Sequence, residues 1–268
     1  MASSLVVMPL EIKPVTLPEP LRASLEDPPE DPEDLREHYT SHGRTFTANG
    51  WRWGWTWIDN KRVSRRFRLR PGERKRGELR WRAGRKTTTL TRVLSAQLGA
   101  GETKDWDLVA DWSVAPSGQR LFCITGYFWM KRGGTSGALY AVDLPGGAVS
   151  EIAHPNSVMD GGLEEVVAVA DDEALLRTRR ALRWFRREGA RWQELATLRV
   201  LAGIELSYGE IDGRRIAALR CHEDKRSLFV ELKGKRLIKL GEVLRPTRQV
   251  AIRDGRALVH VDGRWHAV

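Results

Sequence analysis

The side chains that could act as acids or bases are scattered along this sequence and do not form a recognisable motif. Glu164-Glu165 and Asp171-Asp172 are adjacent pairs. Neighbours in a strand point to opposite faces, so neither pair is an acid/base dyad. Neither GxSxG nor HExxH occurs, and no Gly-rich stretch ends in the Lys-Ser/Thr of a phosphate loop. The sequence therefore predicts no catalytic and no cofactor-binding residues.

The histidines give no stronger signal for a metal. His260 and His266 flank the turn Asp262-Gly263 and could face each other, but two imidazole nitrogens without a carboxylate in reach do not make a ligand set. His222 lies in a charged turn, which is typical of solvated surface. We expect no metal site.

Positive charge is concentrated in one stretch. Residues 61 to 86 hold thirteen lysines and arginines against Glu73 and Glu78, a net charge of +11 (13 − 2), while the whole chain carries +10. Guanidinium forks suit phosphate and carboxylate. An arginine-rich composition explains the same residues without any partner, so both interpretations stay open. The candidate residues for binding a partner or a polyanion are Arg66, Arg68, Arg70, Arg74, Lys75, Arg76, Arg80 and Arg82.

Four tryptophans precede this stretch at every second position, from Trp51 to Trp57. If they form a strand, all four project from one face. Packing in the core is favoured over a platform for stacking bases or sugars.

Side-chain parity also predicts how the strands after the tryptophans pair. A hairpin of residues 63–70 with 78–83 sets Phe67 opposite Trp81. The same register places Arg68 opposite Arg80 and Arg66 opposite Arg82. Such like-charged pairs are mildly destabilising unless an anion neutralises them.

Composition limits the class of protein. Eleven tryptophans and 41% hydrophobic residues indicate a folded chain, whereas 30% charged residues and a mean hydropathy of −0.44 argue against a membrane protein. No apolar run approaches the roughly 20 residues that span a bilayer, and the start lacks the positive region of a signal peptide. Cys123 and Cys221 lack a CxxC spacing and are interpreted as buried free thiols. We therefore expect a soluble, cytoplasmic protein.

The first 43 residues differ from the rest. Residues 1–14 contain an apolar strand candidate, Leu5 to Ile12, and residues 15–43 have the composition of an acidic, Pro-rich linker. Short helices are expected near Glu33 to Tyr39 and Arg92 to Leu98.

Residues 44–268 show a period of about 40 to 50 residues with four short strands in each unit, which is what a propeller blade needs. The units begin near Thr45, Val109, Glu165, Ile204 and Gln249, and turn dipeptides such as Asp212-Gly213 separate their strands. The last unit has only three strands, so we expect a strand from the N-terminus to complete it. The predicted fold is an all-β, five-bladed β-propeller, with a β-sandwich or an irregular β-barrel as the alternative.

One blade carries a family resemblance. Val114 to Leu121 followed by Leu139-Tyr140-Ala141-Val142-Asp143 resembles the blades of WD40-like and other β-propeller repeats. The sequence departs from true WD40 repeats because its units lack the Gly-His and Trp-Asp pairs.

The resemblance implies a non-enzymatic scaffold for protein-protein interaction in a bacterial-type multiprotein system, without a cofactor. Two alternatives stay open. One is a nucleic-acid-binding protein that uses the arginine-rich face of residues 61–86. The other is a propeller hydrolase or lyase with a site in the central channel, for which the nearby candidates are His154, Glu165, Asp171 and Asp172.

Overall fold

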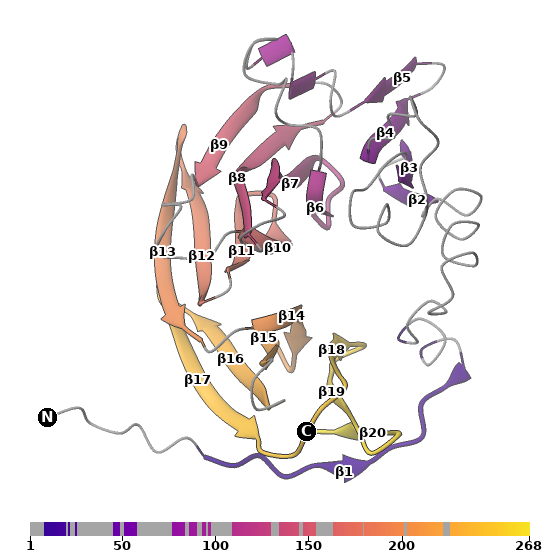
Figure 1. Cartoon of the computed structure of the whole chain (residues 1–268), viewed down its shortest axis with the longest axis vertical. Coiled ribbons are helices and arrows are strands. Elements are labelled where there is room, and N and C mark those ends of the chain that lie inside the picture. The colour runs from indigo at the N-terminus through magenta and orange to yellow at the C-terminus, as the bar shows by residue number, and fades with distance from the viewer. Residues whose placement is uncertain are drawn as a thin grey trace, which may run out of the picture. The chain divides into compact units, whose positions relative to one another are not determined.

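In the computed structural model, the described residues form twenty strands in five four-stranded antiparallel sheets (Figure 1). No helix in the part of the chain that it describes is long and apolar enough to cross a membrane. It describes residues 8–19, 21, 25, 45–48, 51–57, 77–83, 86–89, 93–94, 96–97, 109–129, 134–144, 147–153, 163–178, 180–200, 203–221 and 226–268.

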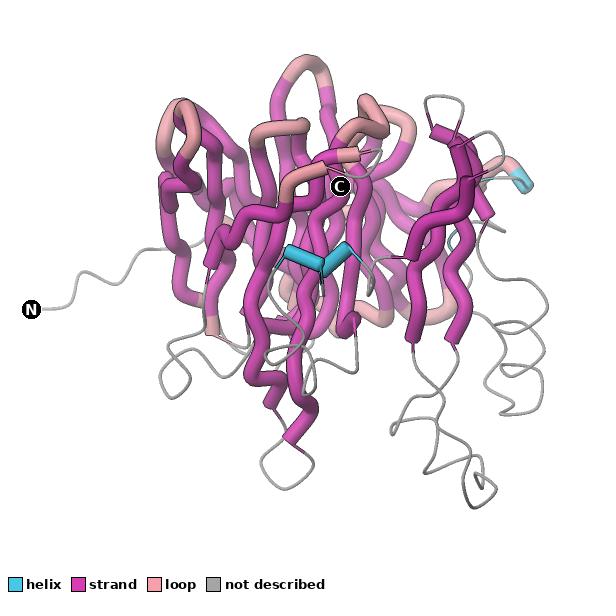
Figure 2. Tube along the Cα trace, turned by 90° about the horizontal axis from the view of Figure 1, so that it is seen from above, coloured by secondary structure: helices cyan, strands magenta, loops and turns pink. Residues whose placement is uncertain are grey.

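Each sheet is a blade, and in four of the five sheets the strands follow one another in sequence. Short turns join several of the neighbouring strands (Figure 2). The chain divides into two compact units, residues 1–25 with 158–268 and residues 26–157. The last blade takes its fourth strand from the N-terminal part of the chain. The chain is therefore an all-β protein with the sheets of a five-bladed β-propeller, as predicted.

The first unit holds three blades. One contains β10 (Leu163–Ala170), β11 (Glu173–Thr178), β12 (Ala181–Glu188) and β13 (Arg191–Arg199). The next contains β14 (Gly203–Ile211), β15 (Arg214–Cys221), β16 (Ser227–Lys233) and β17 (Arg236–Val243). The last contains β18 (Gln249–Arg253), β19 (Arg256–Val261), β20 (Arg264–Ala267) and β1 (Lys13–Pro14).

The second unit holds two blades. One contains β2 (Thr45–Ala48), β3 (Trp51–Trp57), β4 (Gly77–Ala83) and β5 (Lys86–Thr89). The other contains β6 (Val109–Val114), β7 (Arg120–Trp129), β8 (Gly134–Asp143) and β9 (Val149–Ala153). Val93, Leu94, Ala96 and Gln97 are helical, in the expected segment, whereas Glu33 to Tyr39 lies outside the described residues.

Asp-Gly dipeptides shape the tight turns. Asp212, Asp254 and Asp262 each have a φ of 49°, and the glycine that follows each has a φ between 69° and 76°. Two consecutive residues in the left-handed region form the type I′ turn, whose twist matches that of paired strands. The turns predicted at these dipeptides are thus confirmed.

The apolar core of the first unit lies between its blades. One cluster joins Leu175 and Trp184 with Ala217 and Leu219 of the next blade. A second joins Ile216 and Ala218, on the opposite face of β15, with residues of the last blade. Both faces of β15 are therefore buried against neighbours, as the middle strand of a blade requires.

The N-terminal strand completes the last blade, although it lies later in the sequence than expected. Lys13 pairs with Ala267 and Pro14 with His266, so the pairing begins just after the predicted strand, Leu5 to Ile12. Pro9 instead forms a parallel bridge with Glu242 of β17. Proline donates no backbone N–H, and Pro14 is tolerated because β1 is an outer strand.

The predicted pairing inside the first blade was wrong. β4 pairs with β3 on one side, setting Trp53 opposite Trp81, and with β5 on the other. Arg80 faces Gly54 and Thr89, so β4 has no side left for residues 63–70, which lie outside the described residues. The alternation of apolar residues alone did not identify the strand that pairs with β4, because β3 and residues 63–70 alternate in the same way.

Candidate functional site

Two inner strands, β10 and β14, each carry a glutamate directly after a shift in strand register. In β10 the register shifts between Leu163 and Glu165, and in β14 it shifts between Gly203 and Glu205. Each acid then lies opposite an arginine of the second strand. Glu165 faces Arg177, and Glu205 faces Arg220.

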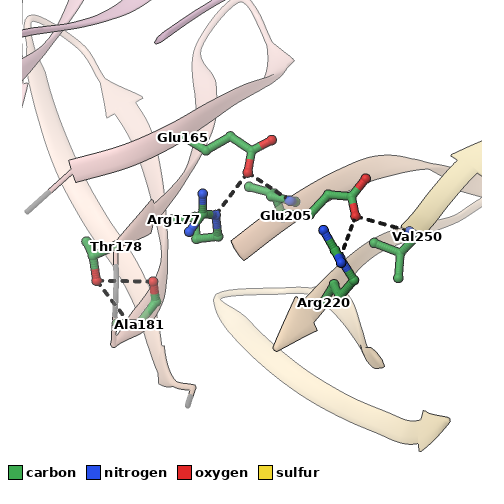
Figure 3. Close-up of polar contacts among 8 residues, drawn as sticks. Glu165, Arg177, Thr178, Ala181, Glu205, Arg220 and Val250 are labelled. Atoms are coloured by element: carbon green, nitrogen blue, oxygen red, sulfur yellow. Dashed lines mark hydrogen bonds and ion pairs between the residues drawn. The ribbon is translucent and has the colours of Figure 1, made fainter. Parts of the chain in front are cut away.

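Each carboxylate joins its own blade to the next (Figure 3). Oε2 of Glu165 accepts hydrogen bonds from Nε of Arg177 at 2.9 Å and from the backbone N–H of Leu206 at 2.8 Å. Oε2 of Glu205 accepts from Nε of Arg220 at 3.0 Å and from the backbone N–H of Val250 at 3.3 Å. We call Glu165 and Glu205 the inter-blade carboxylates.

A third bond of the same kind lies two residues further along β14. Oγ of Ser207 accepts from the backbone N–H of Ile252 at 2.8 Å. A backbone N–H buried without a partner destabilises a fold, so these side-chain acceptors let the inner strands of neighbouring blades pack closely.

The same register position holds related residues in other blades. In the last blade Gln249 lies opposite His260, whose ring contacts that of Trp265 with centroids 5.1 Å apart. In the second unit Asp111 follows a register shift in β6 and lies opposite Ile124. Polar residues thus recur at this position, while the arginine partner occurs in two of the four blades compared.

Burial dominates the electrostatics of Glu205. Desolvation raises the pKa of its carboxyl to about 7, and the nearby charge of Glu165 acts in the same direction. Arg220 and the N–H of Val250 oppose the rise without cancelling it. Glu205 therefore takes up a proton near neutral pH.

A second cluster lies where β10 turns into β11. The buried carboxylate of Glu173 accepts from Nε1 of Trp184 at 2.9 Å, from Nε of Arg186 at 2.8 Å and from Nη1 of Arg215 at 2.8 Å. Both guanidinium groups lie over the Trp184 ring, 5.4 and 4.9 Å from its centroid. Arg215 belongs to the next blade, so this cluster too connects two blades.

Most of the predicted binding residues lie outside the described part of the chain, namely Arg66, Arg68, Arg70, Arg74, Lys75 and Arg76. Arg80 and Arg82 lie in β4. The predicted pairs of Arg68 with Arg80 and of Arg66 with Arg82 are wrong, because Arg80 faces Gly54 and Thr89, and Arg82 faces Arg52 and Thr87.

Among the residues considered for a central-channel enzyme, the structure does not bring Glu165 together with Asp171 and Asp172. Glu165 lies near the start of β10, whereas Asp171 and Asp172 form the turn after its end, roughly 20 Å along the strand. His154 lies outside the described residues.

His260 and His266 do not face each other, although their positions on either side of the last turn allowed it. His260 lies opposite Trp265 and His266 opposite Val259, so the two histidines occupy opposite faces of the sheet. Nδ1 of His266 lies 3.1 Å from the carbonyl oxygen of Arg264. Across the described residues, no three His, Cys, Asp or Glu side chains are grouped to hold a metal ion.

Sequence reasoning missed the arginine partners of the inter-blade carboxylates, although a signal was present. Glu205 and Arg220 lie seven residues before and after the turn Asp212-Gly213, and hairpin pairing makes such symmetric positions neighbours. Glu165 and Arg177 flank Asp171-Asp172 in nearly the same way.

Comparison with known proteins identifies no family. No family model and no curated protein matches this chain. Among solved structures, the chain is similar to YCF48 bound to D1 peptide, at 15% identity and a TM-score of 0.46, covering 70% of this chain and 55% of that one.

Two further solved structures are similar to it. The nidogen/laminin complex shows 9% identity and a TM-score of 0.43, covering 68% of this chain and 63% of that chain. The β-propeller domain of the Trilobed protease from Pyrococcus furiosus, described as having an open velcro topology, shows 10% identity and a TM-score of 0.40, covering 80% and 75%. The chain thus spans less than two thirds of the length of the YCF48 and nidogen/laminin chains.

Proposed function

We propose that this chain is a non-enzymatic scaffold for protein-protein interaction within a bacterial-type multiprotein system in the cytoplasm, with blades akin to WD40-like repeats. The observation that carries the proposal is how the inter-blade carboxylates are hydrogen-bonded. Each accepts hydrogen bonds from an arginine of its own blade and from a backbone N–H of the next. The charged groups of the inner strands therefore hold blades together and are poorly placed to serve a reaction.

Four inter-blade contacts of the first unit support the presentation of a stable surface. The inter-blade carboxylates, Ser207 and the Glu173 cluster each bridge two blades by way of side chains. A surface ordered before binding loses less conformational entropy when a partner docks, and this favours recognition.

The proposed partner-binding residues are Arg66, Arg68, Arg70, Arg74, Lys75, Arg76, Arg80 and Arg82. The net charge of +11 over residues 61 to 86 supports this assignment, because a protein surface rich in carboxylates complements it. We expect the partner to carry such an acidic surface.

The test is reconstitution with a purified partner. The chain is tagged, proteins that co-purify from its native cells are identified, and each is purified and titrated against the chain by calorimetry. We expect one of them to form a stoichiometric complex that a charge-neutralising variant, Arg66→Gln with Arg68→Gln and Arg70→Gln, weakens at least tenfold.

The matched control carries the same loss of charge on outer strands, Arg191→Gln with Arg199→Gln and Arg236→Gln, and should bind as the wild type does. Turnover of ester or oligosaccharide substrates by the purified chain, lost in a folded Glu205→Gln variant, would instead establish an enzyme.

A further inference from the structure

β17 is the outer strand of its blade, so only one of its two edges pairs with a strand of the same sheet. In an antiparallel pair, every second residue directs its backbone N–H and C=O toward the partner strand, and the residues between direct theirs away. Arg236 pairs with Lys233 across a two-residue turn and therefore bonds to β16. Leu237 and Lys239 then direct their backbone groups away from β16.

The chain itself shows that this outer edge accepts a further strand. Pro9 forms a parallel bridge with Glu242, near the end of β17. The N–H of Glu242 donates to the carbonyl of Met8 at 3.1 Å, and its carbonyl accepts from the N–H of Leu10 at 2.9 Å. Within the described residues, no strand makes such bonds along positions 237 to 241. We call residues 237–241 the open edge of β17.

The side chains of the open edge alternate between two faces. Ile238 lies opposite Glu231, which lies opposite Ile216, so Ile238 is on the face that carries the apolar cluster shared with the last blade. It is 38% exposed, one of four large apolar side chains that the described residues leave exposed. Leu237 and Lys239 lie on the other face, and Lys239 is exposed. A strand added here would meet an apolar side chain on one face and an ammonium group on the other.

The outer strand of the neighbouring blade lacks such an apolar side chain. The exposed residues of β13 are all polar, namely Arg191, Gln193, Glu194, Thr197 and Arg199. Polar and charged side chains on an outer strand discourage the addition of another strand. Ile238 therefore distinguishes the open edge of β17 from the edge of β13.

The charge near the open edge is positive. Lys233 and Lys239 are exposed. Glu231 and Glu242 are the acids of β16 and β17, and each forms an ion pair with an arginine, at 2.9 and 3.6 Å. Like charges on paired strands destabilise a sheet, which disfavours pairing with the same edge of a second copy. A strand that carries carboxylates complements this edge.

We propose that the open edge of β17 binds an extended segment of a partner protein in which acidic and apolar residues alternate. The backbone of the segment bonds to the outward groups of Leu237 and Lys239. Its apolar side chains lie beside Ile238 and its carboxylates beside Lys239. In recognition of this kind, main-chain hydrogen bonds give affinity and alternate side chains give specificity. The inference rests on the proposed role as a protein scaffold, and it adds a contact outside residues 61 to 86.

The probe is a fluorescently labelled peptide of about eight alternating valine and glutamate residues, long enough to span the open edge at about 3.3 Å per residue. It is titrated with the full chain by fluorescence polarisation. We expect saturable binding, and no binding of a peptide in which lysine replaces glutamate. Two further peptides are N-methylated, one at every valine and one at every glutamate. Only one set of N–H groups can face β17, so only one of these two should bind.

Two substitutions at one position separate the backbone contact from the charge. Lys239→Pro removes the outward N–H, and an outer strand tolerates proline where that N–H makes no bond within the sheet. Binding should be lost. Lys239→Gln is the matched control, because it keeps the N–H, and it should weaken binding at most about fivefold, the contribution of an exposed ion pair. Equal binding by the two variants would overturn the proposal.

Amide hydrogen exchange of the wild-type chain, resolved by NMR, tests the same contact if Lys239→Pro fails to fold. The amides of Leu237 and Lys239 should exchange quickly in the free chain, that of Ile238 slowly, and the bound peptide should slow the first two. Amides that are slow in the free chain and become fast when residues 1–7 are deleted would identify the N-terminus as the occupant. Amides that slow only as the protein concentration rises would identify a second copy. Either result overturns the proposal, as does an absence of saturable binding up to about 1 mM peptide.

The result can be told apart from a failure of the scaffold itself. If the peptide does not bind but a purified native partner does, and that complex depends on Arg66, Arg68 and Arg70, then the open edge is excluded and the scaffold remains. If the peptide binds as expected and no native partner forms a complex, the open edge is supported as a binding site and the scaffold assignment is wrong.

Discussion

At the scale of single residues, Glu205 shows how burial and pairing compete. Its carboxylate accepts hydrogen bonds from the guanidinium of Arg220 and from the backbone N–H of Val250, yet its pKa is raised. Burial destabilises the charged form more than these two partners stabilise it. An exposed carboxylate with the same partners would titrate well below its ordinary value.

The first prediction concerns the pH dependence of stability. The folded state keeps a proton on Glu205 up to about pH 7, whereas the unfolded chain loses it near 4.5. Between these values the folded state binds more protons, so the free energy of unfolding falls as pH rises through this window. The change is at most about 3 kcal/mol, since one pKa unit corresponds to about 1.4 kcal/mol.

Glu205→Gln should flatten that dependence, giving a variant whose melting temperature, relative to the wild type, rises from pH 5 to pH 8. Differential scanning calorimetry at four pH values measures it. Glu210→Gln, at an exposed position of the same strand, should follow the wild-type curve. Parallel curves for the wild type and Glu205→Gln would contradict the role assigned to this carboxyl.

At the scale of elements, the N-terminal segment links the last two blades of the first unit. The backbone N–H of Leu10 donates to the carbonyl of Glu242 at 2.9 Å, and that of Glu242 donates to the carbonyl of Met8 at 3.1 Å. The chain then pairs with β20, and Leu17 is buried with Leu258 and Trp265 of the last blade. The N-terminal segment therefore contacts both the blade of β14 to β17 and the last blade.

Gly241 permits the close approach that this link needs, which leads to the second prediction. A Cβ at this position would lie 2.6 Å from Cγ of Leu10 and 2.7 Å from the carbonyl oxygen of Met8. Gly241→Ala should therefore displace residues 8–10 and destabilise the first unit by about 1 to 3 kcal/mol, the usual result of overpacking.

Hydrogen exchange measured by mass spectrometry tests this. Exchange should accelerate in residues 8–15 and 264–267 of Gly241→Ala, and strands β6 to β9 of the second unit serve as the internal control. Deleting residues 1–14 should accelerate exchange in β20 as well. Unchanged exchange in residues 264–267 of the deletion variant would show that β1 does not protect the last blade.

At the scale of the whole molecule, each compact unit carries one free, buried cysteine. Cys123 lies in β7 of the second unit and Cys221 in β15 of the first. Burial raises the pKa of the Cys123 thiol, which keeps it protonated at neutral pH.

The third prediction uses these thiols as reporters of unfolding. Iodoacetamide at pH 8 should label neither cysteine within minutes in the native protein, because reaction requires an exposed thiolate. In rising urea, Cys123 should report on the unfolding of the second unit and Cys221 on that of the first, read separately by peptide mass spectrometry. Rapid labelling of either residue without denaturant would contradict its burial.

The strand count and the tight turns followed from sequence alone, for local reasons. Alternation of apolar and polar residues marks a strand, and Asp-Gly at positions 212–213, 254–255 and 262–263 specifies a turn whose backbone few other dipeptides adopt. The three strands after Gln249 likewise indicated that a fourth had to come from elsewhere.

The choice of partners required the tertiary structure. Residues 51–57 and 63–70 alternate alike, so only the pairing of Trp53 with Trp81 identifies which of them lies beside β4. The contacts of the inter-blade carboxylates could be found only from the tertiary structure. Glu165 bonds to Leu206, 41 residues away, and Glu205 bonds to Val250, 45 residues away. Local pattern determines which residues form a strand and a turn, whereas packing between strands distant in sequence decides what each buried charge contacts.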